Sequence, residues 1–178
     1  PLLNSSGRLS SAEIGVKALL SDRKVNSYSI IKSLIDLNNQ RKEIQKKALN
    51  EADLALNSSK NSIIVFSEKW HKGIVGIIAS NLVDKYNKPS IVLTQEKNNL
   101  VGSVRTAKGI NILEILNKCS SFLTKYGGHK SAAGVSLIRK NLTKFKDLFE
   151  EEVGKASNKL TNDKQITIDL VLSIDEIN

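Results

Sequence analysis

The sequence predicts an α/β fold: a mixed β-sheet flanked by helices and preceded by one long connector helix. Three observations lead to this prediction. From residue 61 onward, short apolar runs alternate with helical repeats, as in folds whose strands and helices share one core. Residues 27–56 carry a helical repeat without proline or glycine. The chain has 178 residues, 40% of them hydrophobic, which suffices for one sizeable core but not for a second full catalytic domain.

Two helices are expected before the sheet. Residues 11–21 form a short amphipathic helix, with Ser10 or Ser11 as a possible N-cap. Residues 27–56 repeat apolar side chains at helical spacing, and a helix of roughly 28 residues spans about 42 Å at 1.5 Å per residue. Because this exceeds the width of a small domain, we interpret the helix as a rigid connector between domains.

The sheet and its helices are predicted from the patterns that follow. Pro89 ends one helical stretch, and the pair Gly127 and Gly128 follows the end of another. Strands are expected over residues 62–67, 90–95, 100–106, 132–138 and 166–174, and helices over residues 73–86, 110–123 and 144–159.

The middle of the chain is basic. The net charge is +9, and residues 61–140 contain 12 Lys and Arg against 4 Asp and Glu. Such a bias favours a polyanionic ligand. Lys and Asn are abundant throughout, however, as in proteins from AT-rich genomes, so a compositional background explains the charge equally well.

Composition also suggests where the protein acts. No apolar run approaches the roughly 20 residues that cross a bilayer, and no signal peptide is evident, so a soluble cytoplasmic protein is expected. Cys119 is expected to be a buried structural thiol. The chain starts at Pro1 and contains no methionine, which suggests a fragment of a longer parent.

The segment LVGSVRT carries a candidate phosphate site. Side chains alternate along a strand, so Ser103 and Arg105 share one face while Val104 points into the core. Gly102 lets a ligand or another backbone approach closely. A hydroxyl and a guanidinium two positions apart form a phosphate-sized donor site. The alternative is an ordinary strand with a solvated arginine.

Two further glycine-containing segments are candidates. In YGGHKSAAG, Gly127 and Gly128 suggest a tight turn from which His129 projects, although a helix C-cap before a packed strand fits as well. In WHKGIVGIIA, the glycines and Lys72 suggest an anion site at a helix start, and Trp70 either stacks on a base or packs in the core.

No metal centre is expected in this chain. His71 and His129 are its only histidines, and no cluster of Asp and His accompanies them. Two-metal hydrolysis needs several convergent carboxylates and imidazoles. A P-loop, a G-x-S-x-G elbow and a CxxC pair are also missing from the sequence.

Taken together, these motifs resemble the RecJ family of the DHH phosphoesterase superfamily. WHKGIVGIIAS is similar to its W-H-x-G-[IV]-[IV]-G-I-[IV]-A signature, GSVRT to its G-S-x-R strand, and GGHKSAAG to the G-G-H-x-x-A-A-G loop of its DHHA1 domain. LNSSGRL resembles the segment that closes the DHH catalytic domain, with serines where alanines are common. The resemblance implies four parts: a DHH tail at 1–22, a connector helix at 23–60, a DHHA1 substrate-binding domain at 61–162, and a truncated OB-fold start at 163–178.

The resemblance also implies a function. Members degrade single-stranded DNA from the 5′ end with Mn²⁺ or Mg²⁺ held by the DHH domain, in DNA repair and recombination. This chain is then the substrate-binding half, inactive alone and without a cofactor of its own. Expected partners are single-stranded DNA, single-strand-binding protein and a helicase, and a monomer is expected. His129 is the candidate catalytic residue, and the expected substrate-binding residues are Ser103, Arg105, Gly102, Gly127, Gly128, Arg8, Trp70 and His71.

Two alternatives stay open at this point. One is an oligoribonuclease or nucleotide phosphatase of the same superfamily, which also carries a GGH loop. The other is a non-catalytic nucleic-acid-binding module. The W-H-x-G signature and the long connector helix favour the exonuclease, and the presence of Ser103, Arg105 and His129 favours an active parent over a silent module.

Overall fold

The computed structural model describes residues 2–21, 24–56, 60–106, 109–158, 170 and 173. Its helices are α1 (Leu2–Leu9), α2 (Glu13–Leu20), α3 (Lys24–Leu54), α4 (Val75–Tyr86), α5 (Ile112–Lys118) and α6 (Leu142–Ser157). Its strands are β1 (Ile63–Phe66), β2 (Ser90–Glu96), β3 (Asn99–Arg105), β4 (Lys125–His129) and β5 (Ala132–Ile138). Apart from 170 and 173, the strand predicted over 166–174 and the OB-fold start at 163–178 lie outside the described residues.

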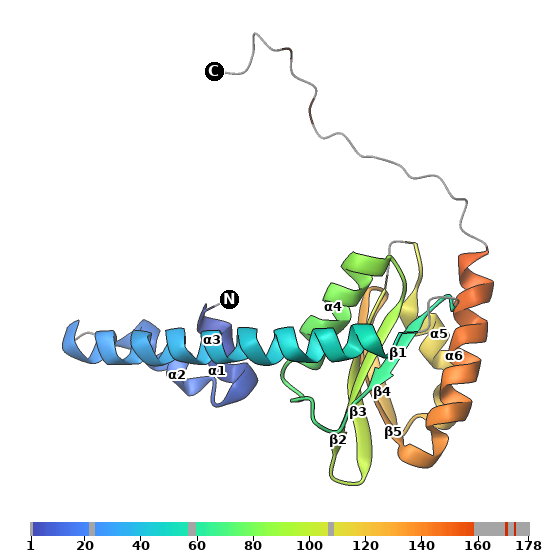
Figure 1. Cartoon of the computed structure of the whole chain (residues 1–178), viewed down its shortest axis with the longest axis horizontal. Coiled ribbons are helices and arrows are strands. Elements are labelled where there is room, and N and C mark those ends of the chain that lie inside the picture. The colour runs from blue at the N-terminus through green and yellow to red at the C-terminus, as the bar shows by residue number, and fades with distance from the viewer. Residues whose placement is uncertain are drawn as a thin grey trace.

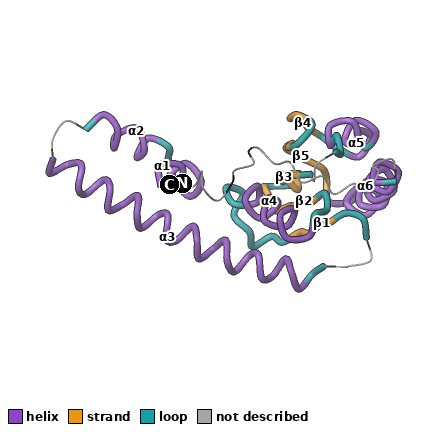
Figure 2. Tube along the Cα trace, turned by 90° about the horizontal axis from the view of Figure 1, so that it is seen from above, coloured by secondary structure: helices purple, strands orange, loops and turns teal. Residues whose placement is uncertain are grey.

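The five strands form one mixed sheet in the order β1-β2-β3-β5-β4. β1 and β2 are parallel, and every other pair is antiparallel. β1 and β4 are therefore the edge strands (Figures 1 and 2). The predicted α/β class with a mixed, helix-flanked sheet is confirmed.

Helices cover the two faces of the sheet unequally. α5 and α6 pack on one face, around a core that includes Leu100, Val104, Phe145 and Phe149. On the other face, α4 lies over β2 and β3, and the C-terminal half of α3 packs beside it. Figure 2 shows β4 and β5 beyond the edge of α4. This uncovered part of the sheet becomes one wall of the groove described below.

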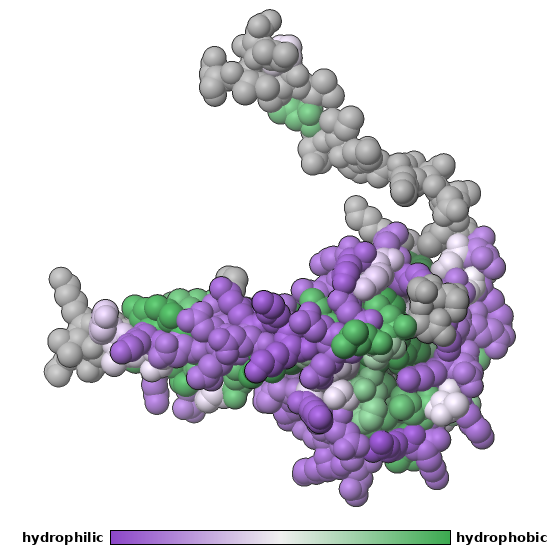
Figure 3. Space-filling view, viewed as in Figure 1, coloured by the Kyte–Doolittle hydropathy of each residue, from purple (hydrophilic) through white to green (hydrophobic). Residues whose placement is uncertain are grey.

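The long helix α3 joins two parts of the molecule. Its 31 residues span about 46 Å at 1.5 Å per residue, somewhat longer than predicted. Near its N-terminal end it packs against α1 and α2, and near its C-terminal end Ala48 and Ala52 are buried against the sheet domain. Hydrophobic side chains remain on the surface of the α1–α2–α3 unit, including Leu19 and Leu20 at 72% and 74% exposure (Figure 3).

One local expectation was wrong. Gly127 and Gly128 form neither a tight turn nor a helix cap; they lie within strand β4, and the turn follows at Lys130 and Ser131. Residues 2–9, for which no secondary structure was predicted, form helix α1. Its Ser5 is fully buried against α3, where the hydroxyl donates to the carbonyl oxygens of Leu2 and Leu34.

Candidate nucleic-acid-binding groove

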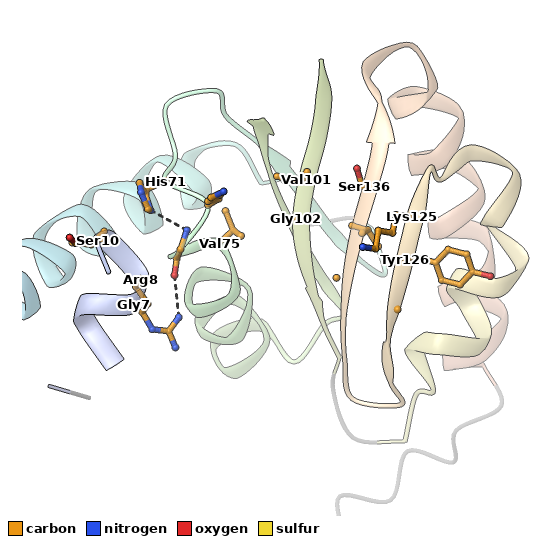
Figure 4. Close-up of a pocket in the computed structure, with 16 residues that line it drawn as sticks. Gly7, Arg8, Ser10, His71, Val75, Val101, Gly102, Lys125, Tyr126 and Ser136 are labelled. Carbon is orange, nitrogen blue, oxygen red and sulfur yellow. Dashed lines mark hydrogen bonds between the residues drawn. The ribbon is translucent and has the colours of Figure 1, made fainter. Parts of the chain in front are cut away.

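A groove of about 620 Å³ separates α1 from the uncovered part of the sheet. Figure 4 shows Gly7, Arg8 and Ser10 on one side of it and Lys125 and Ser136 on the other. It is lined by Gly7, Arg8, Leu9, Ser10, His71, Lys72, Gly73, Val75, Val101, Gly102, Lys125, Tyr126, Gly127, Gly134, Val135 and Ser136. The helical unit and the sheet domain thus both contribute to one concave surface.

Part of the groove floor belongs to cross-strand rows on β3, β5 and β4. Residues directly opposite each other on neighbouring strands share a face. The register therefore aligns three rows on the α4 side of the sheet: Val101–Ser136–Lys125, Ser103–Gly134–Gly127 and Arg105–Ala132–His129. Ser103 and the whole third row are not among the residues that line the groove. The middle row is nearly bare backbone, while the rows on either side of it carry cationic or titratable side chains.

The glycines of the floor fall into two classes. A Cβ on Gly102 would lie 2.3 Å from the Val92 carbonyl oxygen, and one on Gly128 would lie 2.3 Å from the Ala132 carbonyl oxygen. Packing of the sheet itself therefore requires glycine at these two positions. In contrast, a Cβ on Gly127 would meet nothing within 4 Å, and one on Gly134 would have only the Gly102 carbonyl oxygen, at 3.9 Å.

The fold thus offers no steric reason for glycine at 127 and 134. Glycine inside a strand costs roughly 0.5–1 kcal/mol relative to alanine. Two such residues lie side by side in one row and face the groove. A ligand that approaches the backbone closely would account for both.

Ser103 and Arg105 are brought together as the alternation predicts. The Arg105 Nη1 donates to Ser103 Oγ at 2.7 Å and to the Val104 carbonyl oxygen at 2.8 Å. Both side chains lie against the first turn of α4, because a Cβ on Gly76 would be 3.2 Å from Arg105 Nη2 and 3.3 Å from Ser103 Oγ. The positive end of the α4 dipole adds to the local field.

Arg8 places a second cation near this pair. Its Nη1 donates to the Gly73 carbonyl oxygen at 3.1 Å, which holds the end of α1 against the segment before α4 (Figure 4). Burial lowers the pKa of Arg105, and the positive charge of Arg8 lowers it further. Among the described residues, neither arginine has a carboxylate partner. Two neighbouring guanidinium groups without an acid form a site that an anion would stabilise.

The two histidines occupy different places around the groove. His129 ends β4 in the Arg105 row; its side chain is exposed, and its Nδ1 accepts from the Ser131 N–H at 3.4 Å. His71 lines the groove on the α1 side, where its Nδ1 accepts from the Gly73 N–H at 3.1 Å. In both cases Nε2 has no hydrogen-bond partner among the described residues and is the nitrogen that could meet a ligand.

For Trp70 the structure selects the second of the two interpretations, packing in the core, and Lys72 lines the groove but is paired with an acid. Trp70 is 6% exposed and its Nε1 donates to Glu51 Oε2 at 2.8 Å, so it packs in the core and joins the sheet domain to α3; it is not available to stack on a base. Lys72 pairs with Glu96 at 2.5 Å on the surface. Gly73 precedes α4 instead of lying in its first turn, because the helix starts at Val75.

Several groove residues escaped the sequence reasoning, among them Lys125, Gly134 and Ser136. Had residues 125–138 been recognised as a β-hairpin, alternation would have placed Lys125, Gly127 and His129 on one face. The signal was the symmetric small-residue pattern on either side of Lys130 and Ser131.

Within the described ranges, no group of three or more His, Cys, Asp or Glu side chains could hold a metal ion. The donors near the groove are therefore not a fit for a two-metal centre. In the same ranges, no helix is both long and apolar enough to cross a bilayer.

Comparisons with known proteins agree on one family. The model of the DHHA1 domain matches residues 59–155. The single-stranded-DNA-specific exonuclease RecJ of Bacillus subtilis is 32% identical over 99% of this chain, and the match covers 23% of that protein. The Mg²⁺-bound RecJ structure from Thermus thermophilus is 26% identical with a TM-score of 0.81 over 87% of this chain and 24% of that one.

A manganese-bound RecJ exonuclease structure is 25% identical with a TM-score of 0.80, over 90% of this chain and 41% of that one. The chain thus spans roughly a quarter of the length of the curated relative from Bacillus subtilis.

Proposed function

The chain belongs to the DHHA1 domain family, and from that premise we propose that it is the substrate-binding half of a RecJ-like exonuclease whose groove holds the backbone of single-stranded DNA. The observation that carries the proposal is the pair Arg8 and Arg105 beside Ser103, without an acidic partner among the described residues. Guanidinium and hydroxyl donors at this spacing suit a phosphate group.

The rest of the groove supports a strand that continues past this phosphate. Lys125 stands at the opposite end of the floor, in a position to contact another phosphate. Between the two ends, Gly127 and Gly134 leave room for a sugar or base to lie directly on the sheet. A groove with cations at its ends and a bare floor favours an extended polyanion over a small globular ligand.

His129 is proposed to act on the phosphate next to Arg105, since both residues share a row of the sheet. A hydrogen bond from its Nε2–H to a phosphate oxygen would stabilise negative charge that develops during hydrolysis. Arg105 and Ser103 would hold the same group in place. In this proposal, these residues bind and orient the phosphate group, and none of them supplies the nucleophile.

The remaining functional expectations concern the longer protein. Metal-dependent hydrolysis from the 5′ end is proposed, with Mn²⁺ or Mg²⁺ bound outside the described residues, whose donors do not fit such a centre. The chain alone is proposed to be inactive. A monomeric cytoplasmic enzyme of DNA repair and recombination, acting with single-strand-binding protein and a helicase, is proposed on the family resemblance. The domain boundaries at 22, 60 and 162 rest on the same resemblance.

The test is a titration of a fluorescent oligothymidylate with this chain, followed by anisotropy at several salt concentrations. Arg105→Ala should weaken binding about tenfold, or roughly 1.4 kcal/mol, and reduce the slope of log K against log salt by about 0.7. The matched control is Arg139→Ala, which removes the same charge from an exposed arginine paired with Glu68, outside the groove lining. Equal losses in the two variants would mean that net charge, not the groove, binds DNA.

A further inference from the structure

The strand β1 leaves one edge of the sheet open. Among the described strands it pairs only with β2, through hydrogen bonds that include Ile63 N to the Pro89 carbonyl oxygen at 2.8 Å and Ser67 N to the Leu93 carbonyl oxygen at 3.2 Å. Successive residues of a strand direct their N–H and C=O groups to opposite sides. The backbone groups of Ile64 and Phe66 therefore point away from β2, toward the open edge.

A second groove, of about 200 Å³, runs along this edge. Its floor is β1 itself, at Ile63, Ile64 and Val65. One wall is the end of the α3 segment at Ala55 and Leu56, and the other wall comes from α6. Figure 3 shows hydrophobic side chains at the surface in the region of β1. The groove is small, and the backbone edge of β1 lies along it, which is the feature that strand addition uses.

Lysines give this second groove a positive charge. Lys60 and Lys146 line it, and among the described residues neither forms an ion pair. Burial lowers the pKa of Lys146, and the charge of Lys60 lowers it further.

Glu150, the one acid among the described residues of the lining, already accepts hydrogen bonds. Its carboxylate accepts from Asn61 N at 2.5 Å and from Ser62 N at 3.0 Å, and it also bonds the Ser62 hydroxyl. Two lysines against this single carboxylate leave the lining with an excess of one positive charge.

Proteins protect open edges with short strands, charged side chains, proline, bulges or a covering helix or loop. β1 is short, at four residues, and the segment after α3 and helix α6 flank its edge. Its own sequence, Ile-Ile-Val-Phe, contains neither a charge nor a proline. The opposite edge strand, β4, begins with Lys125, a charge of the kind that protects an edge. The open edge of β1 is therefore the one suited to accept another strand.

We propose that the β1 edge is a docking site for an acidic, extended segment of a partner protein, which adds to the sheet as a further strand. Its backbone would pair with the free groups of Ile64 and Phe66, and its acidic side chains would meet Lys60 and Lys146. A nucleic acid strand has no alternating backbone donors and acceptors to match a β-ladder, so a peptide fits this groove better. The site is separate from the groove between α1 and the sheet.

The test uses this chain and a synthetic fluorescent peptide that alternates Val and Thr and ends in two Asp residues. We expect saturable binding that a peptide ending in two Lys residues does not show, and that weakens at least tenfold in Lys146→Glu. In amide-exchange measurements, the N–H groups of Ile64 and Phe66 should become protected when the acidic peptide is bound. An oligothymidylate should not displace the peptide.

Backbone pairing is tested separately from charge. Ile64→Pro removes an N–H that β2 does not use, and proline is tolerated on the open side of an edge strand. It should abolish peptide binding, whereas Ile64→Ala, which loses the same side-chain packing but keeps the N–H, should retain it. If Ile64→Pro fails to fold, a peptide N-methylated on the side facing β1 provides the same test with the unaltered protein.

Three results would overturn the proposal. Equal binding of the acidic and basic peptides would remove the role of the lysines. Unchanged binding of the N-methylated peptide would remove the role of the strand edge. Displacement of the peptide by oligothymidylate would make this groove part of a nucleic-acid surface instead.

Discussion

Gly127 and Gly128 are adjacent in β4 but should respond in opposite ways to substitution. A side chain at Gly127 enters open space, and the residue has an ordinary negative or extended backbone conformation. A side chain at Gly128 would clash with the Ala132 carbonyl oxygen at 2.3 Å, at a φ of +154° that favours glycine. Substitutions at Gly128 therefore test the stability of the fold, and substitutions at Gly127 test the function of the groove.

The magnitudes follow from these surroundings. Gly127→Ala should increase the free energy of unfolding by about 0.5–1 kcal/mol, because it removes backbone entropy from the unfolded chain without a clash. Gly128→Ala should decrease it by about 2 kcal/mol or more, through strain and steric overlap. Urea denaturation followed by circular dichroism measures both.

Substitution of Gly127, which should not harm stability, should instead weaken DNA binding. Gly127→Val fills the middle row of the groove floor, so its affinity for oligothymidylate should fall at least tenfold, about 1.4 kcal/mol, while the protein stays folded. A Gly127→Val variant that is stable and binds with unchanged affinity would refute the assignment of this floor to the DNA strand. Gly134→Val, on the neighbouring strand in the same row, offers an independent repeat of the measurement.

Two further predictions concern His129 and Cys119. In the longer parent enzyme, His129→Ala should lower kcat by a larger factor than it weakens DNA binding, and equal losses in single-turnover rate and affinity would assign His129 to binding alone. Burial raises the pKa of Cys119 to about 11, and Glu152 contributes to the rise. The thiol ionises at a lower pH in the unfolded chain than in the folded one, so the free energy of unfolding should fall as the pH rises from about 9 to 11. Denaturation of Cys119→Ala at several pH values should lack this loss. Identical pH profiles for the two proteins would contradict the prediction.

Local sequence patterns predicted most of the helices and strands, because the periodicity of apolar residues depends only on neighbouring positions in the chain. The uninterrupted repeat of α3 and the alternation in β2 and β3 each specify an element without reference to the rest of the chain. Helix α1 was missed because Ser5, Ser6 and Gly7 are weak helix formers. Tertiary packing stabilises it instead, since both serines are fully buried and their hydroxyls donate to carbonyl oxygens within the helix.

Local patterns also predicted part of the candidate site. Ser103 and Arg105 are close in sequence, and strand alternation alone brings them together. The role of Trp70 depends on Glu51, which lies 19 residues earlier on another element. No local pattern reveals that contact, so a core tryptophan and a base-stacking one look alike in sequence. Likewise, the proximity of Arg8 to Arg105 exists only once the end of α1 packs against the segment that precedes α4.

The lining of the main groove also bears on what kind of DNA recognition to expect. Proteins read base edges chiefly with Arg, Lys, Asn, Gln, Asp and Glu, and hold the backbone with cations, hydroxyls and main-chain N–H groups. Lys72 and Lys125 are the lysines among the described lining residues, and Lys72 is paired with Glu96. Among the described residues that line the groove there is no Asn, Gln, Asp or Glu, and Arg8 already donates to the Gly73 carbonyl oxygen. A bare floor at Gly127 and Gly134 would contact any base equally, because it offers no side chain that distinguishes one base from another. If a strand lies here as proposed, its binding should therefore depend on salt and length but little on sequence.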